Sequence, residues 1–259
     1  MAATLAHAEW GAGPPVVVLH GLFGSSQNWA TVARRLGALF RVLVPDLRNH
    51  GASPWARPMD YPAMAEDVAA FMAVQKIPAA PIVGHSMGGK AAMVLALTNP
   101  ALVDRLVVVD IAPVARPTVL DPYIAAMAHL DLAGLRRRTE ADAAMKPDIP
   151  DAAVRNFLLQ NLVASEDGLR WRINLEVLRD DMPKIAGFPD FPPGTNYRGP
   201  TLVVRGGASD YVDDAGLAAF ARLFPNHHEV VVPGVGHWVH AEAADAFLAA
   251  VTPFLTERC

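Results

Sequence analysis

A serine between glycines is the residue of this sequence whose type and setting most clearly suggest covalent catalysis. Residues 84–88 read Gly-His-Ser-Met-Gly, a G-x-S-x-G motif. The motif follows an apolar, strand-like run and precedes a helix-like run, which is the setting that this motif requires. A serine there lies in a sharp turn, and the flanking positions must lack side chains. Ser86 is therefore the predicted nucleophile, with its hydroxyl exposed at the C-terminal edge of a sheet.

A serine hydroxyl is a weak nucleophile until a base takes its proton, and a histidine on a late loop is suited to that role. His237 follows the last strand-like run, and Gly234 and Gly236 give its loop freedom to turn. His240, three residues further on, is the alternative, although we expect it to face elsewhere on the first helical turn. The predicted base is His237.

Backbone N–H groups are expected to hold the negative charge that develops on the attacked carbonyl oxygen. The first predicted donor is Met87, directly after the nucleophile. The second is Leu22, in the loop "LHGLFGSSQNW" after the first buried strand, with Phe23 as the alternative. An apolar substrate pocket is expected beside these donors. Phe23, Trp171 and Trp238 are candidates for its walls, and the two tryptophans are equally suited to packing in a core.

Two aspartates compete for the role of the acid that orients the histidine. Asp110 directly follows the run "RLVVV", and a right-handed crossover places that strand beside the nucleophile strand, at the edge where α/β sites assemble. Asp210 follows a late strand, directly after Ser209. Successive side chains point to opposite sides, so we expect Ser209 to face the histidine and Asp210 to turn away. Asp110 is the predicted acid; a bulge at Gly206-Gly207 would instead favour Asp210.

The elements that must position these residues alternate short β-rich runs with helical segments. That alternation is typical of an α/β fold with a mostly parallel, doubly wound sheet. The strand-like runs are "PPVVVLHG", "FRVLVPDLRNHG", "AAPIVGHS", "DRLVVVDIAP", "GPTLVVRGG" and "HHEVVVPGVG", with "TLAHAEW" as an antiparallel edge strand. Helices are expected near residues 26–38, 62–75, 87–98, 214–223 and 241–255.

The segment 114–198 interrupts this alternation. It is helical in pattern, as in "YIAAMAHLDLAGLRRR" and "DAAVRNFLLQNLV", and it contains no strong buried strand. A loop of this length without structure would be unusual. The sequence therefore predicts an α/β core formed by residues 1–113 and 199–259, with residues 114–198 as a helical cap over one end of the sheet.

Composition limits the classes of function. A chain of 259 residues can bury one large core. Its formal net charge of −4 and the lack of a long Lys/Arg run give no sign of a nucleic-acid partner. The single cysteine, Cys259, excludes an intrachain disulfide and fits a reducing compartment. With no secretory leader and no apolar run near the roughly 18 residues of a membrane span, we expect a cytoplasmic protein. The oligomeric state does not follow from the sequence.

Several motifs together resemble one family over nearly the whole chain. They are "HGLFGSSQNW", "PDLRNHGASP", "YPAMAEDV", "GHSMGGKAAM", "VVVDIAP", "RWRINLEVL" and "GVGHWVHAE". They look like the α/β-hydrolase serine esterases, in the bacterial acyl-esterase branch related to abhydrolase domain-containing protein eleven. The resemblance implies a capped α/β-hydrolase fold without cofactor or metal, acting on esters or thioesters of short to medium acyl chains. It also implies Ser86, His237 and Asp110 as the catalytic residues, with a serine allowed at the late-strand position of Ser209.

The resulting hypothesis is a serine hydrolase that forms an acyl-enzyme on Ser86 from a small-molecule acyl ester or thioester. Within the same fold, a carbon–carbon bond hydrolase or a perhydrolase is an alternative. A non-catalytic module that binds a small molecule is another, because a fold does not determine a function. Turnover of a generic p-nitrophenyl ester separates the enzymes from the binding module.

Overall fold

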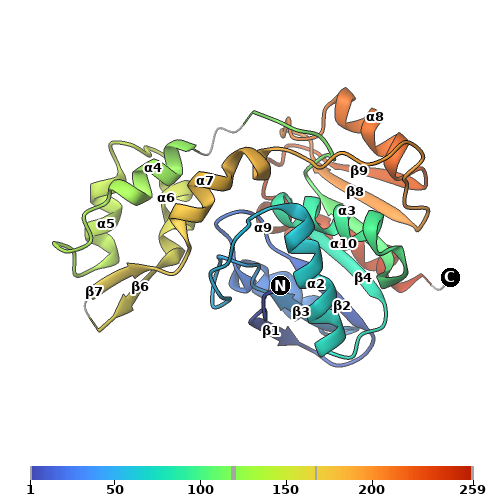
Figure 1. Ribbon diagram of the computed structural model, residues 1–259, viewed down its shortest axis with the longest axis horizontal. Coiled ribbons are helices and arrows are strands. Elements are labelled where there is room, and N and C mark those ends of the chain that lie inside the picture. The colour runs from blue at the N-terminus through green and yellow to red at the C-terminus, as the bar shows by residue number, and fades with distance from the viewer. Residues whose placement is uncertain (1, 118–120, 167, 258–259) are drawn as a thin grey trace.

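The computed structural model describes residues 2–117, 121–166 and 168–257, so Cys259 lies outside the described residues. Seven strands form one sheet in the order β1-β3-β2-β4-β5-β8-β9 (Figure 1). Strand β1 is antiparallel to β3, and all other neighbours are parallel, which confirms the predicted α/β sheet. The strands are β1 (His7–Trp10), β2 (Pro15–Leu19), β3 (Arg41–Pro45), β4 (Ala80–His85), β5 (Val103–Val109), β8 (Thr201–Gly206) and β9 (His227–Val232).

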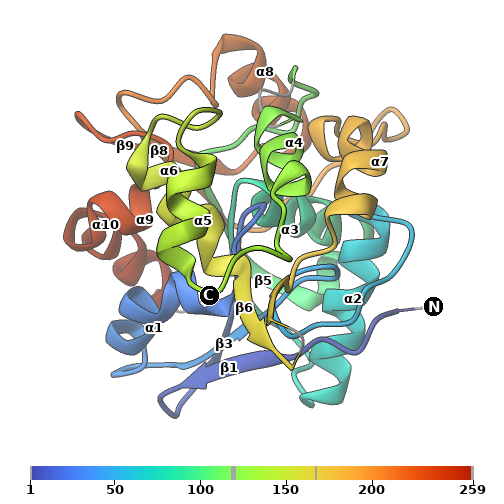
Figure 2. The same cartoon turned by 90° about the vertical axis from the view of Figure 1, so that its left-hand side faces the viewer.

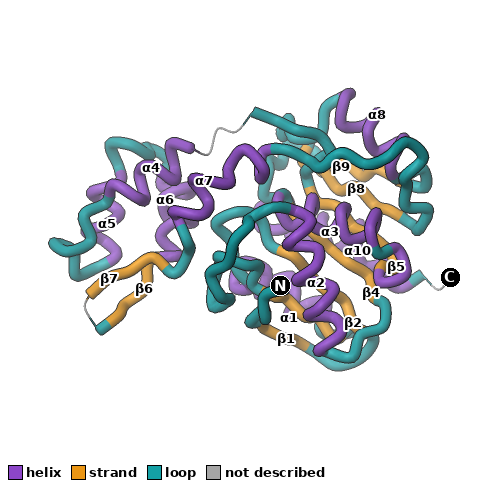
Figure 3. Tube along the Cα trace, in the orientation of Figure 1, coloured by secondary structure: helices purple, strands orange, loops and turns teal. Residues whose placement is uncertain are grey.

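The central strands are apolar without alternation because both faces of the sheet are covered. Residues 16–19 of β2 and 106–109 of β5 have no exposed surface. Figure 3 shows helices in front of the sheet and behind it. Side chains of α2, α3 and α8 belong to one apolar core, and side chains of α1 and α10 belong to the other.

The helices of the sheet region match the expected segments closely. They are α1 (Ala30–Leu36), α2 (Tyr61–Val74), α3 (Met87–Thr98), α8 (Asp214–Leu223), α9 (Val239–Glu242) and α10 (Ala244–Thr256), with short 3₁₀ turns at Ser26–Trp29 and Pro100–Leu102. Two of the expected helices are divided. The one near 26–38 begins as the 3₁₀ turn, and the one near 241–255 is preceded by the separate short helix α9.

Between β5 and β8 the chain leaves the sheet and forms the helical insertion, residues 114–198. It contains α4 (Asp121–His129), α5 (Arg138–Met145), α6 (Ala152–Leu158), a 3₁₀ turn (Leu159–Asn161) and α7 (Leu175–Ala186). It also contains an antiparallel hairpin of β6 (Leu162–Ser165) and β7 (Gly168–Trp171), which the sequence did not indicate. These strands are short and only partly buried, so no apolar run marks them. Figures 1 and 2 show the insertion standing beyond one end of the sheet.

Polar contacts fasten the insertion to the loops that follow β2 and β3. The backbone N–H of Asn174, at the start of α7, donates to the carbonyl oxygen of Asn49 at 3.0 Å. The side-chain amide of Asn161 donates to the carbonyl oxygen of Phe23 at 2.8 Å. These loops lie at the C-terminal edge of the sheet, so the insertion is held against the edge where the candidate catalytic residues gather.

Candidate active site

The candidate nucleophile occupies a strained turn between β4 and α3. Ser86 has φ 53° and ψ −120°, and a positive φ is uncommon for a residue with a side chain. A Cβ on Gly84 would lie 2.4 Å from the carbonyl oxygen of Gly88, and a Cβ on Gly88 would lie 2.5 Å from that of His20. Strand, turn and helix are therefore packed so closely that both glycines of the G-x-S-x-G motif are required.

A continuous line of hydrogen bonds joins Ser86, His237 and Asp110. The Nε2 atom of His237 lies 3.0 Å from the Oγ of Ser86, and its Nδ1 atom lies 2.7 Å from Oδ2 of Asp110. Asp110 is fully buried. A carboxylate can only accept from Nδ1–H, which leaves Nε2 free to accept the serine proton. The structure thus brings together the three residues that the sequence analysis selected.

Strand pairing explains why Asp110 reaches the histidine. His85 pairs with Val109, and Val109 pairs with Val204, so the ends of β4, β5 and β8 lie side by side. Asp110 follows β5, between the nucleophile turn and the loop after β8. Its Oδ1 accepts a hydrogen bond from the backbone N–H of Gly206 at 2.9 Å. Strand β5, the middle one of the three, therefore places the buried carboxylate of Asp110 beside His237.

The loop after β8 differs from the expectation in one respect. Ser209 was expected to face His237, but its hydroxyl donates to Oδ2 of Asp110 at 2.5 Å. The carboxylate lies between the two side chains, so the serine contacts the acid and not the imidazole. Asp210 turns away as expected, with its side chain 89% exposed and 3.5 Å from Arg116.

Two backbone N–H groups beside Ser86 are available to an oxyanion. Met87 is the first residue of α3, and the first N–H groups of a helix have no partner within it. For the N–H of Leu22, no acceptor lies within hydrogen-bond distance in the described part of the chain. The alternative donor, Phe23, instead donates to Nε2 of His50 at 3.3 Å. The geometry favours Leu22 with Met87 over Phe23.

The other histidines near this edge are buried and neutral. Burial lowers the pKa of His50 and His240 to about 3, with further lowering from neighbouring histidines. His240, the alternative base, stacks on Trp29 at 4.1 Å between ring centroids and lies inside the core. His85 donates from Nε2 to the carbonyl oxygen of His237 at 3.0 Å. These side chains support the site, and His237 is the histidine in contact with Ser86.

Glu242, which the sequence did not indicate, contacts the backbone on both sides of His237. Its carboxylate accepts from the backbone N–H of Gly236 at 2.8 Å and from that of Trp238 at 3.3 Å. The sequence signal for Glu242 is an acid in the first turn of a short helix that begins two residues after His237. Free N–H groups near the start of a helix stabilise carboxylates there. Its contacts fix the loop that carries the imidazole.

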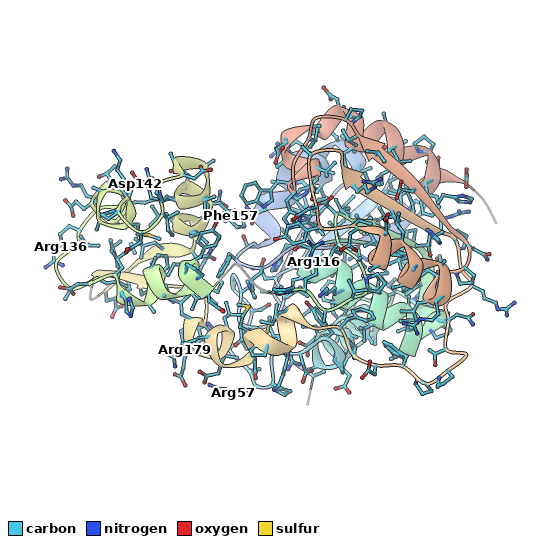
Figure 4. The ribbon with its side chains drawn as sticks, turned by 90° about the horizontal axis from the view of Figure 1, so that it is seen from above. Arg57, Arg116, Arg136, Asp142, Phe157 and Arg179 are labelled. Carbon is cyan, nitrogen blue, oxygen red and sulfur yellow. The ribbon has the colours of Figure 1, made fainter. Side chains whose placement is uncertain are left out.

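A cavity of about 220 Å³ opens beside Ser86, between the core and the insertion. The expected residues Phe23 and Trp238 line it, as do Leu22 and Met87. Figure 4 shows Phe157 at the junction between the insertion and the core. The insertion supplies further apolar walls, from Val154, Phe157, Leu158, Met182 and Ile185.

Trp171 is not a wall of this cavity, so that expectation is corrected. Its indole N–H donates to the carbonyl oxygen of Met127 at 3.0 Å, which ties β7 to α4 within the insertion. Two cationic residues that were not foreseen, Lys90 and Arg116, do line the cavity. The signal for Lys90 was its place in "GHSMGGK", four residues after Ser86 and so on the same helix face.

Among the residues that the structure describes, no group of three or more His, Cys, Asp or Glu side chains is placed to hold a metal ion. No helix in the same part of the chain is both long enough and apolar enough to cross a membrane.

A family model, related sequences and a solved structure all match this chain to the same class of enzyme. A family model described as alpha/beta hydrolase fold matches residues 14–244. The sn-1-specific diacylglycerol lipase ABHD11 of Xenopus tropicalis is 40% identical over 251 residues, covering 94% of this chain and 78% of the relative. Esterase YbfF of Escherichia coli (strain K12) is 38% identical over 244 residues, covering 94% and 93%. Among solved structures, a marine microorganism esterase superimposes with a TM-score of 0.95 at 35% identity, covering 98% and 100%.

Proposed function

The chain belongs to the α/β-hydrolase fold family, and from that premise we propose that Ser86, His237 and Asp110 are its catalytic triad. The chain is a carboxylic ester hydrolase, as its named relatives are esterases and a lipase. The observation that supports the triad is the hydrogen-bonded line from the Oγ of Ser86 through His237 to the buried Asp110.

Acylation begins when the ester carbonyl enters the cavity beside Ser86. The Oγ atom attacks the carbonyl carbon while Nε2 of His237 takes the hydroxyl proton. Asp110 holds the ring through Nδ1 and stabilises the imidazolium that forms. The N–H groups of Leu22 and Met87 receive the negative charge on the carbonyl oxygen. His237 then gives its proton to the departing alcohol or thiol, and the acyl group remains on Ser86.

Deacylation repeats these steps with water. His237 accepts a proton from a water molecule, whose oxygen attacks the acyl carbon. The second tetrahedral intermediate uses the same two N–H groups. Collapse releases the carboxylic acid and returns the proton to the Oγ of Ser86, so the enzyme regains its starting state without a cofactor.

We propose esters and thioesters with short to medium acyl chains as the substrates. A cavity of about 220 Å³ with mainly apolar walls suits an acyl group of that size. We further propose residues 114–198 as a cap domain on a core of residues 1–113 and 199–259, because the apolar walls from the insertion close the cavity above Ser86.

Labelling and a substrate panel test this proposal. A fluorophosphonate probe is expected to label one serine, Ser86, which peptide mass mapping identifies. The values of kcat/KM for a panel of p-nitrophenyl esters and acyl-CoA thioesters then show which leaving group and which acyl-chain length the enzyme prefers. Labelling at another serine, or turnover that persists after complete labelling, would contradict the assignment.

The insertion is expected to set the preference for acyl-chain length. Phe157 lines the cavity and lies 5.5 Å from Trp238 between ring centroids. Phe157→Ala should enlarge the cavity and move the optimum of kcat/KM to longer p-nitrophenyl esters. Each added methylene that the enlarged cavity accommodates should raise kcat/KM about fivefold, since one methylene in a pocket is worth about 1 kcal/mol. Leu169→Ala is the matched control, because Leu169 packs in the insertion outside the cavity. An unchanged optimum in Phe157→Ala would place the determinant in the loops of the core.

We also propose a cytoplasmic location. The single cysteine excludes an intrachain disulfide, which fits a reducing compartment, where disulfides are rare. Fractionation of cells of the source species tests this proposal, and recovery of the esterase outside the cytoplasmic fraction would contradict it.

A further inference from the structure

Two cationic side chains line the cavity although its other walls are mostly apolar. Lys90 lies on α3, four residues after Ser86, and Arg116 lies near the start of the insertion, before α4. The two residues meet at one atom. The carbonyl oxygen of Ala186, the last residue of α7, accepts from Nζ of Lys90 and from the backbone N–H of Arg116, each at 3.0 Å. The Lys90 ammonium and the Arg116 backbone therefore meet at the end of α7, and both side chains line the cavity.

Lys90 is a buried charge without a carboxylate partner in the described part of the chain. The residue is 3% exposed. Its ammonium donates to the carbonyl oxygens of Ala186 and Gly187, at 3.0 and 2.6 Å, and lies 5.6 Å from the centroid of the Tyr61 ring. An ammonium has three donors, so one remains for a ligand. A buried charge is costly without an opposite charge, and a bound anion would supply it.

Burial, together with the nearby positive charge of Arg116, lowers the pKa of Lys90 to about 8. At pH 7 most molecules therefore still carry the ammonium. The effect of Arg116 on this pKa agrees with the shared contact at Ala186 in placing the two cations close together.

Arg116 extends the cationic wall toward the catalytic histidine. Its guanidinium lies 5.3 Å from the centroid of the Tyr211 ring, and that ring stacks on His237 at 3.9 Å. The acid that faces Arg116 is Asp210, whose side chain is 89% exposed, so water screens this ion pair. The Nη1 atom of Arg116 also donates to the backbone carbonyl oxygen of Asp210. A guanidinium has five N–H donors, so others remain for a carboxylate inside the cavity, where water screens the charges less. Figure 4 shows Arg116 on the core side of the junction with the insertion.

We propose that Lys90 and Arg116 form an anion subsite for a carboxylate carried by the ester substrate. The enzyme would then prefer acidic esters over neutral esters of the same size. The carboxylate can belong to the acyl part, as in a hemiester of a dicarboxylic acid, or to the leaving alcohol. This inference rests on the proposed function, because the site around Ser86 defines which bond is cleaved.

Two matched pairs of substrates test the subsite and distinguish its sources. The acyl pair is mono-p-nitrophenyl glutarate and its methyl ester. The leaving-group pair is the butyrate ester of 4-hydroxybenzoate and that of methyl 4-hydroxybenzoate. We expect kcat/KM to favour the acidic member of one pair by about 10- to 100-fold, the effect of a hydrogen bond between charged groups. Lys90→Met and Arg116→Met should each lower that ratio by about tenfold.

Arg136→Met is the matched control. It removes one positive charge from an exposed position of the insertion, at the end away from the core in Figure 4. The ratio of acidic to neutral kcat/KM should equal that of the unmodified enzyme. A ratio that falls as far in Arg136→Met as in Arg116→Met would show a general effect of net charge and overturn the subsite.

Other outcomes decide the proposal as clearly. Equal kcat/KM within both pairs would overturn it. A Lys90→Met enzyme that slows acidic and neutral esters by one common factor would show that the ammonium only holds the end of α7. If that variant does not fold, the unmodified enzyme gives the answer: monomethyl glutarate should inhibit neutral-ester turnover more strongly than its amide, and equal inhibition would refute the subsite. Turnover of neutral esters and labelling of Ser86 report the proposed function separately.

Discussion

The Ser86→Ala protein is expected to fold like the unmodified chain and to form no acyl-enzyme. The substitution removes one oxygen atom from a half-buried turn, so the core and the sheet keep their contacts. Without that oxygen no ester bond to the protein can form. Stopped-flow mixing with a p-nitrophenyl ester should show a burst of p-nitrophenol from the unmodified enzyme and none from the variant. Steady-state turnover alone is a weaker test, because catalysis of roughly 10³-fold over water can persist without the triad.

Ser165→Ala provides the control for this experiment. Ser165 lies in the hairpin of the insertion, where its hydroxyl donates to the carbonyl oxygen of Gly168. The burst should be retained in this variant, and circular dichroism should be the same for all three proteins. A burst that survives in Ser86→Ala would show that another residue carries the acyl group.

Asp110→Asn is expected to lower kcat by up to roughly 10⁴-fold with little change in the fold. An amide in this position can donate to Nδ1 and so favours the tautomer whose Nε2 carries the proton. That Nε2 can no longer accept the proton of Ser86. The measurement is kcat for a small neutral ester, after thermal melting has shown that the variant is folded.

Two neighbouring substitutions locate the acid. Asp210→Asn should be close to the unmodified enzyme, because its exposed carboxylate faces Arg116 and not the histidine. Ser209→Ala should be impaired several-fold, since it removes one donor to the carboxylate of Asp110. An inactive Asp210→Asn beside an active Asp110→Asn would show that the acid lies after β8, one residue from its usual position.

The sheet could be predicted because its central parallel strands, buried on both faces, leave short apolar runs rich in valine and bounded by turn residues. The positions of Ser86 and Asp110 could be predicted for the same reason, since each residue directly follows such a run. The hairpin of β6 and β7 could not, because its four-residue strands are only partly buried and depend on contacts within the insertion. Trp171 was misplaced because an indole packs equally well in a core and in a pocket wall.

The contacts that the sequence did not indicate depend on long-range packing. Lys90 faces the cavity because the end of α7, almost one hundred residues later, supplies its two acceptors. Ser209 contacts Asp110 through the pairing of β5 with β8. Local sequence patterns predict where strands end. The hydrogen-bond partner of a polar side chain can be identified only when the fold has brought a distant segment next to it.

The backbone strain at two of the proposed catalytic residues has an evolutionary consequence. Ser86 and Asp110 both have positive φ angles, 53° and 52°, which cost about 1 kcal/mol or more each. Glycine adopts such angles without steric strain, so a lineage selected for heat resistance alone would relieve that strain by placing glycine at both positions. It would thereby lose its nucleophile and its acid. Heat-resistant descendants that remain esterases must therefore acquire their stability elsewhere, in loops, caps or surface charge, while these two positions keep their cost.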